Sequence, residues 1–139
     1  MNKKTIEDID VNGRRVLARV DYNVPFDDDG HITDDARIRE TLPTLRYLLE
    51  HGATVVLMAH LGRPKGRVVE ELRLAPVARR LGELLGKNVQ TALDCVGTQA
   101  EIAVKSMQPG GVLLLENLRF HPEEEKNDEA FARQLAQFG

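Results

Sequence analysis

The run Thr54-Val55-Val56-Leu57-Met58-Ala59 decides the fold class, because it contains six successive apolar or β-branched residues shortly after a glycine. Such a continuous run predicts a strand buried on both faces of a parallel sheet. Two further runs predict strands, Arg15–Val20 with partial alternation and Val112–Leu115 after a Pro-Gly-Gly sequence. A weaker, shorter strand is expected over Asn88–Thr91.

Apolar residues recur at helical spacing between these strands and after the last one. The expected helices are Leu42–Leu49, Leu74–Leu85, Ala100–Met107 and Asp128–Phe138. Thr41 is a candidate N-cap of the first and Gly139 a candidate C-cap of the last. Gly82 weakens the second by about 1 kcal/mol relative to Ala. The alternation of strands and helices predicts an open, three-layer, Rossmann-like α/β domain, with a parallel sheet and helices on both faces.

The composition fits one domain of 139 residues, with 42% hydrophobic and 29% charged residues. A single cysteine excludes an internal disulfide and a cysteine-built zinc site. The first residues lack a signal-peptide core, and no apolar run approaches the ~20 residues of a membrane span, which favours a cytoplasmic protein. A net charge of −3 gives no indication of a nucleic-acid or membrane partner.

Polar and cationic side chains follow three of the predicted strands, where ligands of open α/β sheets bind. The first strand leads into Asp21-Tyr22-Asn23, the second into His60-Leu61-Gly62-Arg63, and the last into Glu116-Asn117-Leu118-Arg119. Thirteen of the 19 basic residues are arginines, whose planar forks suit carboxylate and phosphate groups. The three strand exits therefore predict a positively lined pocket for a small anion.

Each candidate residue also has a structural interpretation, and spacing alone leaves both open. Arg63 could lie in a solvated basic turn, and His60 could be a structural histidine. Asp21 could cap the following turn. Arg119 could form an internal ion pair with the carboxylate three residues before it. For Arg37, the residues alone favour a surface ion pair with a nearby acid.

Several other motifs do not carry a site. The sequence contains neither a P-loop nor Gly-x-Gly-x-x-Gly, so no nucleotide or other cofactor site is expected in this chain. Asp27-Asp28-Asp29-Gly30 is expected to be an acidic hairpin tip rather than a calcium loop. The acidic run Glu123–Glu129 is expected to be a solvated helix start. No histidine can be placed beside Cys95, which favours a buried structural thiol, and no metal site is expected.

Four motifs, in this order and spacing, resemble the amino-terminal domain of phosphoglycerate kinase. They are Arg19–Pro25, Asp34–Ile38, His60–Gly66 and Leu114–Phe120. The resemblance runs over essentially the whole chain and includes Glu124–Asp128. It implies a monomeric, two-domain transferase of glycolysis that moves a phosphoryl group reversibly between 1,3-bisphosphoglycerate and ADP, giving 3-phosphoglycerate and ATP.

The resemblance also assigns roles to individual residues. Arg37 is implied to be the catalytic arginine, which revises the surface-pair interpretation. Mg-ATP and Mg-ADP are implied to bind the carboxyl-terminal domain of the full-length protein rather than this chain. The residues implied to contact 3-phosphoglycerate are Asp21, Asn23, Arg37, His60, Leu61, Gly62, Arg63 and Arg119.

Family chains continue well beyond position 139, and the chain ends where a further strand would be due. We therefore expect residues 1–139 to be a truncated, incomplete amino-terminal domain that binds 3-phosphoglycerate but is inactive alone. An unpaired sheet edge would favour self-association of such a fragment. A non-catalytic anion-binding module and a structural or interaction domain are the alternative functions.

Overall fold

A computed structural model describes residues 10–121 and 129–138, apart from the side chain of Phe131, and contains a four-stranded parallel sheet. The strands are β1 (Arg15–Arg19), β2 (Thr54–Met58), β3 (Val89–Thr91) and β4 (Val112–Leu114), in the spatial order β1-β2-β4-β3. All three pairings are parallel. The open parallel α/β sheet predicted from the sequence is confirmed.

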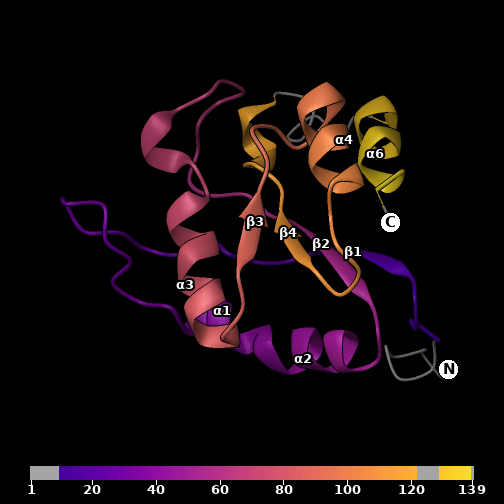
Figure 1. Cartoon of the computed structure of the whole chain (residues 1–139). Helices are drawn as coiled ribbons and strands as arrows, with labels where there is room; N and C mark the ends of the chain where they lie inside the picture. The colour runs from indigo at the N-terminus through magenta and orange to yellow at the C-terminus, as the bar shows by residue number, and fades with distance from the viewer. Residues whose placement is uncertain (1–9, 122–128, 139) are drawn as a thin grey trace, which may run out of the picture.

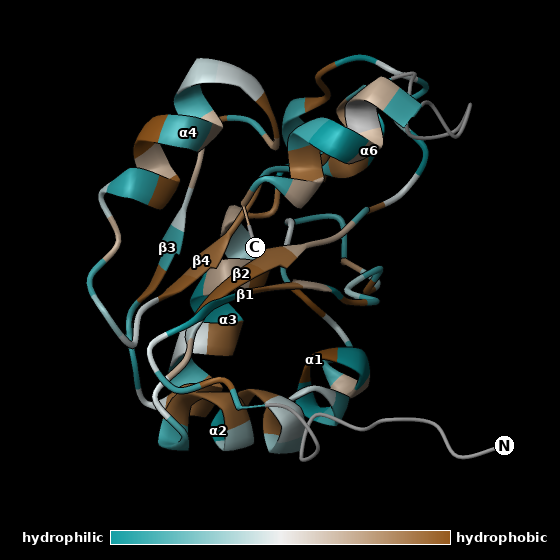
Figure 2. Ribbon diagram, turned by 90° about the vertical axis from the view of Figure 1, so that its right-hand side faces the viewer, coloured by the Kyte–Doolittle hydropathy of each residue, from teal (hydrophilic) through white to brown (hydrophobic). Residues whose placement is uncertain are grey.

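The chain reverses its direction across the sheet after β3, and this reversal creates the third layer. The path from β1 through β2 to β3 runs one way, and the path from β3 to β4 runs back. Because crossovers between parallel strands are right-handed, a reversal moves the connecting helix to the other face. Accordingly α1 (Ala36–Glu40), α2 (Leu42–Glu50) and α3 (Ala75–Leu85) lie on one side, and α4 (Gly97–Lys105) and α6 (Glu129–Ala136) on the other (Figures 1 and 2).

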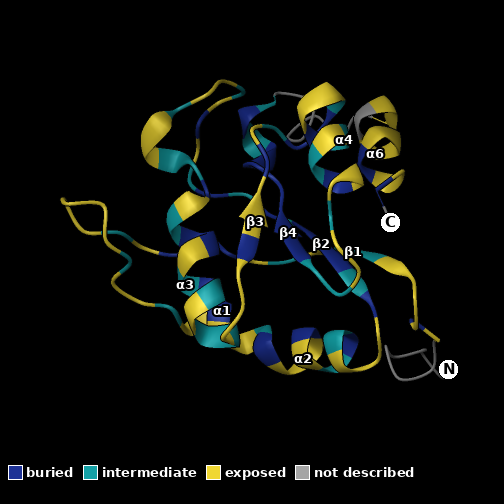
Figure 3. Ribbon diagram, viewed as in Figure 1, coloured by how far each residue is buried: buried dark blue, intermediate teal, exposed yellow. Residues whose placement is uncertain are grey.

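Two hydrophobic cores fill the spaces between the sheet and its helices. Val55, Leu57 and Leu114 point into one, which is shared with α1, α2 and α3. Val56 and Leu113 point into the other, which is shared with α4 and α6. Figure 3 shows the two central strands buried, as their uninterrupted apolar sequences predict.

The structure corrects the expected helices in detail. All four form, but α1 and two 3-10 helices, η2 (Glu70–Leu72) and η3 (Leu118–Phe120), are additional. Thr41 is not a side-chain cap of α2: its hydroxyl donates to the Ile38 carbonyl at 2.7 Å and lies 2.7 Å from the Tyr22 hydroxyl. The predicted cap Gly139 and most of the acidic run from Glu123 fall outside the described residues.

The acidic segment after β1 forms the expected hairpin tip. Phe26 and Ile32 make an isolated antiparallel bridge, and the Asp27 carboxylate accepts from the backbone N–H groups of Asp29 and His31. Those backbone hydrogen bonds, above all the one from His31, lower the pKa of Asp27. Within residues 10–121 and 129–138, no helix has the length and apolar character needed to span a bilayer.

Gly82 lies inside α3 at a point where no side chain fits. A Cβ at this position would lie 2.8 Å from the carbonyl oxygen of Lys87, which follows the left-handed Gly86 that ends the helix. The Lys87 N–H in turn donates to the Gly82 carbonyl at 3.1 Å. The glycine thus permits the close turn from α3 into β3, and this requirement outweighs its poor helix propensity.

We predict that Gly82→Ala destabilises the domain, although helix propensity alone would favour Ala by about 1 kcal/mol. Forcing the Cβ against backbone should lower the free energy of unfolding by about 1–3 kcal/mol. Urea unfolding measures the difference. Arg79→Ala, on the exposed side of the same helix, is the control and should change it by less than about 0.5 kcal/mol. A stabilised Gly82→Ala variant would contradict the packing argument.

Candidate functional site

Hydrogen bonds join the three strand exits into one continuous surface. The Asn23 side-chain oxygen, after β1, accepts from the Gly62 N–H at 2.9 Å, after β2. The Leu118 N–H, after β4, donates to the Ala59 carbonyl at 3.0 Å. The predicted convergence of the exits is therefore seen, and hydrogen bonds of both backbone and side-chain groups hold it.

Asn117, just after β4, is the centre of this connection. Its side chain is fully buried, and its oxygen accepts from the N–H groups of Leu61 and Arg119 at 3.2 and 3.1 Å. Its NH₂ group donates to the carbonyls of Leu61 and Leu72 at 2.8 and 2.9 Å. The sequence alone predicts no role for Asn117. The available signal was an amide between the apolar Leu115 and Leu118, where a buried polar group requires partners.

Glu116 does not pair with Arg119, so that structural alternative is wrong. The buried Glu116 carboxylate accepts from the N–H of Leu74 at 3.0 Å and from Nη1 of Arg73 at 3.1 Å. Hydrogen bonds to Glu70 first, and then to Glu116, raise the pKa of Arg73 above its ordinary value. Arg73 also lies 5.8 Å from the centre of the Phe120 ring. Arg73 is thus the internal partner that sequence analysis missed.

Two arginines of the exits are left without an anionic partner in the described part of the chain. The Nε atom of Arg119 is buried and has no hydrogen-bond partner there. Arg63 is exposed and makes no ion pair with any residue in 10–121 or 129–138. His60 is half-buried, with its Nδ1 atom shielded from solvent. A guanidinium N–H that is shielded from water and unsatisfied favours an anion as its partner.

Arg37, on α1, forms an ion pair with Asp21 after β1. Its Nη1 lies 2.9 and 3.0 Å from the two carboxylate oxygens, and the side chains are 49% and 63% exposed. Asp21 also accepts from the Asn23 N–H at 3.2 Å, which is the turn cap considered above. The surface pair expected for Arg37 therefore exists, but it links α1 to the first strand exit.

The acids next to Arg37 in sequence have other partners. Asp35 binds Arg39 and Arg80, each at 2.8 Å, and hydrogen bonds from those arginines, with Arg39 first, lower the pKa of its carboxyl. Asp34 accepts from the Ala36 N–H at 2.9 Å at the start of α1. These contacts fix the start of α1 and hold it against α3, leaving Asp21 as the partner of Arg37.

Leu61 and Gly62 support the second exit through their backbones. Leu61 is buried, and its N–H and carbonyl both bind Asn117. Gly62 has a φ of +62°, and a Cβ there would lie 2.7 Å from a methyl group of Leu72. Because both N–H groups already donate to asparagine side chains, a substrate contact of either residue stays a prediction.

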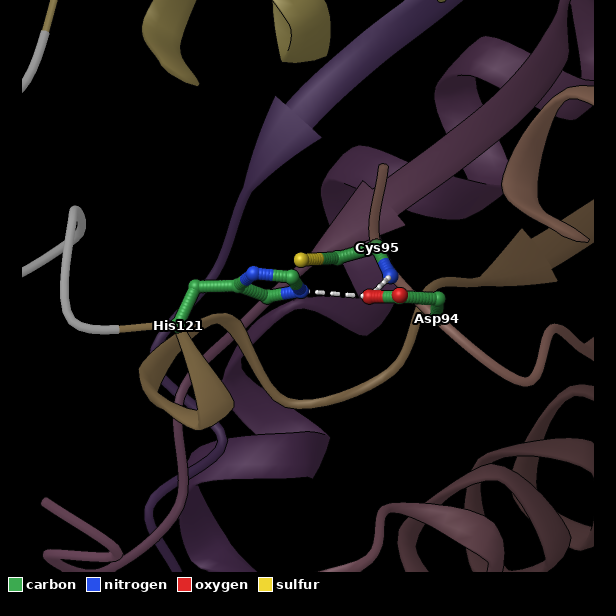
Figure 4. A group of neighbouring side chains, drawn as sticks. All are labelled: Asp94, Cys95 and His121. Atoms are coloured by element: carbon green, nitrogen blue, oxygen red, sulfur yellow. Dashed lines mark hydrogen bonds and ion pairs between the residues drawn. The ribbon is translucent and has the colours of Figure 1, made fainter. Parts of the chain in front are cut away.

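The structure corrects the expectation that no histidine lies near Cys95. His121, directly after η3, makes a hydrogen bond with the Asp94 carboxylate, with Nε2 and Oδ1 2.6 Å apart, and the Cys95 thiol lies beside them (Figure 4). Cys95 itself is buried, as predicted. No sequence spacing indicated this cluster, since 26 positions separate the cysteine from the histidine.

Comparison with known proteins agrees with this geometry. The family model for phosphoglycerate kinase matches residues 6–139. The chain belongs to the phosphoglycerate kinase family. The phosphoglycerate kinase of Moorella thermoacetica is 62% identical over 136 residues, covering 98% of this chain and 34% of that protein. The phosphoglycerate kinase of Prosthecochloris aestuarii is 58% identical over 139 residues, covering 100% of this chain and 35% of that protein.

Solved phosphoglycerate kinase structures share the fold. The structure from Pyrococcus horikoshii has a TM-score of 0.83 at 37% identity, covering 96% of this chain and 34% of that one. The structure from Coxiella burnetii has a TM-score of 0.80 at 36% identity, covering 95% and 32%. The chain thus spans about a third of the length of its phosphoglycerate kinase relatives.

We predict that Asn117→Ala destabilises the domain by about 2–4 kcal/mol, because buried groups left unsatisfied cost about 1–3 kcal/mol each. Urea unfolding measures the loss. Asn88→Ala is the matched control, since Asn88 is exposed, and it should differ from the unsubstituted chain by less than about 0.5 kcal/mol. Equal stability of the two variants would show that the Asn117 hydrogen bonds do not hold the exits together.

Proposed function

We propose that this chain is the 3-phosphoglycerate-binding part of a cytoplasmic, glycolytic phosphoglycerate kinase. The complete enzyme transfers a phosphoryl group reversibly between 1,3-bisphosphoglycerate and ADP. The observation that carries the proposal is the buried Arg119 Nε, which has no hydrogen-bond partner in the described residues and lies at the strand edge expected to bind an anion. Membership of the family makes a phosphorylated carboxylate the natural candidate for that anion.

The substrate has a phosphate at one end and a carboxyl group at the other, and the exits offer complementary groups. Arg63, Arg119 and His60 would form the cationic patch that holds the triose. Asp21 and Asn23 would contact its hydroxyl and carboxyl end. The Asp21 carboxylate can accept from the hydroxyl, and the Asn23 NH₂ group can donate to the carboxylate. Arginine forks bind both phosphate and carboxylate through paired hydrogen bonds, which fixes the orientation of a small molecule.

Arg37 is proposed as the catalytic residue. Phosphoryl transfer passes through a loose, highly charged transition state, so a positioned cation contributes more than a covalent nucleophile. The Arg37–Asp21 pair is exposed on both sides, and exposed ion pairs contribute only about 0–1 kcal/mol. An arriving acyl phosphate could therefore replace Asp21 as the partner of Arg37 at small cost.

The nucleotide belongs to another part of the proposed full-length protein. This sequence contains neither of the glycine-rich phosphate-binding motifs, and no group in it is assigned to Mg-ATP or Mg-ADP. Closure of two domains over the substrates would exclude water from the transferring phosphoryl group. The 139-residue chain is accordingly proposed to bind substrate without catalysing the reaction.

Removing Arg63 should weaken substrate binding. Hydrogen bonds to charged groups contribute roughly 1.5–3 kcal/mol, so Arg63→Ala should raise the Kd for 3-phosphoglycerate about tenfold or more. Calorimetric titration of a full-length enzyme carrying this sequence measures the change. Arg67→Ala, in the same loop, is the control for general loss of charge and should change Kd by less than about threefold. Equal effects of the two substitutions would contradict the assigned contact.

A titration with inorganic phosphate tests the alternative function. If the enzyme bound phosphate as tightly as 3-phosphoglycerate, a non-catalytic anion-binding module would be favoured.

Arg37→Ala should act on the reaction rather than on binding. If the guanidinium meets charge mainly in the transition state, kcat should fall by roughly a hundredfold or more, with a much smaller change in KM. A coupled assay of the same full-length enzyme measures both constants. Arg39→Ala is the control, because Arg39 is also exposed on α1 and pairs with Asp35.

A pure KM effect would make Arg37 a substrate clamp instead. The same assay should detect no turnover by the 139-residue chain alone. Without a positioned second reactant, the activation free energy can rise by about 7–11 kcal/mol. Robust turnover by that chain would contradict the assignment of the nucleotide to another part of the protein.

A further inference from the structure

Three different metal-ligating side chains meet beyond the carboxyl ends of β3 and β4. Asp94 and Cys95 lie between β3 and α4, and His121 follows η3. A carboxylate oxygen, the thiol sulfur and a ring nitrogen all lie within 4.8 Å of one another (Figure 4). Cys95 is buried, while the side chains of Asp94 and His121 are 41% and 27% exposed. The cluster therefore has a buried sulfur and a side open to solvent.

This donor set is selective in its chemistry. Thiolate and imidazole bind borderline-soft ions such as Zn²⁺, whereas Ca²⁺ and Mg²⁺ prefer sets of oxygen ligands. Zinc bonds of about 2.0–2.3 Å place tetrahedral ligands roughly 3.3–3.6 Å apart. The atoms of the cluster are already near that spacing, since none of the three separations exceeds 4.8 Å. Binding one ion would require the three side chains to adjust from their present separations to that spacing.

We propose that Asp94, Cys95 and His121 form a three-ligand zinc site, with the fourth tetrahedral position left to water. Zn²⁺ would take the place of the hydrogen-bond proton between His121 and Asp94, now 2.6 Å apart, as these groups move slightly outward. The thiol proton leaves to solvent as the sulfur–zinc bond forms, and no group is oxidised or reduced. The imidazole nitrogen that binds the ion must be unprotonated, so its hydrogen-bond proton moves to the other ring nitrogen or, from an imidazolium, leaves to solvent.

The surroundings favour a metal ion over oxidation of the thiol. A sulfur without solvent exposure is a poor target for peroxide, because reactive cysteines are partly exposed. A metal ion can instead enter from the side of Asp94 and His121. The Cys95 N–H donates to the Asp94 carboxylate at 2.7 Å and so orients this ligand. The other group of such side chains in the described residues is Asp27, Asp29 and His31, which are all exposed and include no sulfur ligand.

The proposed ion would also tie two loops together. Cys95 and Asp94 belong to the connection that leaves β3, and His121 ends the segment that carries Arg119. The Glu116 N–H already contacts the Asp94 carbonyl at 3.4 Å, so the two connections are neighbours without a metal. The site is independent of the substrate-binding proposal, because none of its three ligands is assigned to substrate.

Cobalt substitution tests the proposal on the 139-residue chain. Co²⁺ gives intense visible bands in tetrahedral sites and a separate charge-transfer band when a thiolate binds it. Cys95 is the only cysteine, so the charge-transfer band reports on this residue alone. We expect the chelator-treated, reduced protein to develop both bands, saturating at one equivalent, and to lose them when Zn²⁺ is added. Absence of the charge-transfer band in the unsubstituted chain would overturn the proposal without any variant.

Variants identify the other two ligands. His121→Gln and Asp94→Asn should each weaken cobalt binding by more than about tenfold. Circular dichroism checks that each variant folds. Asp94→Asn retains a side-chain oxygen that can accept from the Cys95 N–H, so it still tests the site if His121→Gln does not fold. His31→Gln is the matched control and should leave the titration unchanged.

Unaltered binding by both ligand variants would contradict the site. Fast peroxide oxidation of Cys95 without a cobalt band would overturn it in favour of a redox-sensitive thiol. Thermal destabilisation of His121→Gln without that band would indicate a purely structural cluster.

Discussion

The requirement that buried polar groups be satisfied organises the strand exits of this domain. Asn117 has no solvent exposure, and its amide makes four hydrogen bonds to backbone groups of two other segments and of its own turn. Each bond would cost free energy if broken without a replacement, so the geometry of the turn after β2 and that of η3 are fixed together. The position of Arg119 relative to Arg63 thus depends on an uncharged residue that touches neither guanidinium.

Glu116 determines the electrostatics of the same region. A carboxylate in the interior needs a cation and several N–H donors, and Arg73, Leu74 and Asn117 supply them. The Glu116 charge is consequently compensated away from the strand edge, and it does not neutralise Arg119. Arg119 can stay cationic without a carboxylate partner in a chain of net charge −3, because Glu116, three residues before it, is paired with Arg73.

Much of the fold could be predicted because both apolar central strands and the periodic helices have strong local signals. The α1 helix could not be predicted, because its five residues show too little periodicity. The order of the strands could not be predicted either, because it depends on packing between distant segments. The sequence indicated which residues follow the strands, but it could not distinguish Arg73 from Arg119 as the partner of Glu116. That choice depends on contacts 43 positions apart. The cysteine–histidine cluster was missed for the same reason.

The arginines of the domain differ in how easily each can exchange its carboxylate partner, and the solvent exposure of the ion pair determines this. Arg73 is held by a buried carboxylate, and removing one member of such a pair costs roughly 3–5 kcal/mol because the other charge stays buried. Arg37 and Asp21 are both largely hydrated, and their pair contributes about 0–1 kcal/mol. Displacing Asp21 from Arg37 by another anion would therefore cost less free energy than displacing Glu116 from Arg73. An arginine–carboxylate pair thus stabilises the fold at Arg73 but is easily exchanged at Arg37. The difference is that the Glu116 carboxylate is buried, whereas the Asp21 carboxylate is exposed.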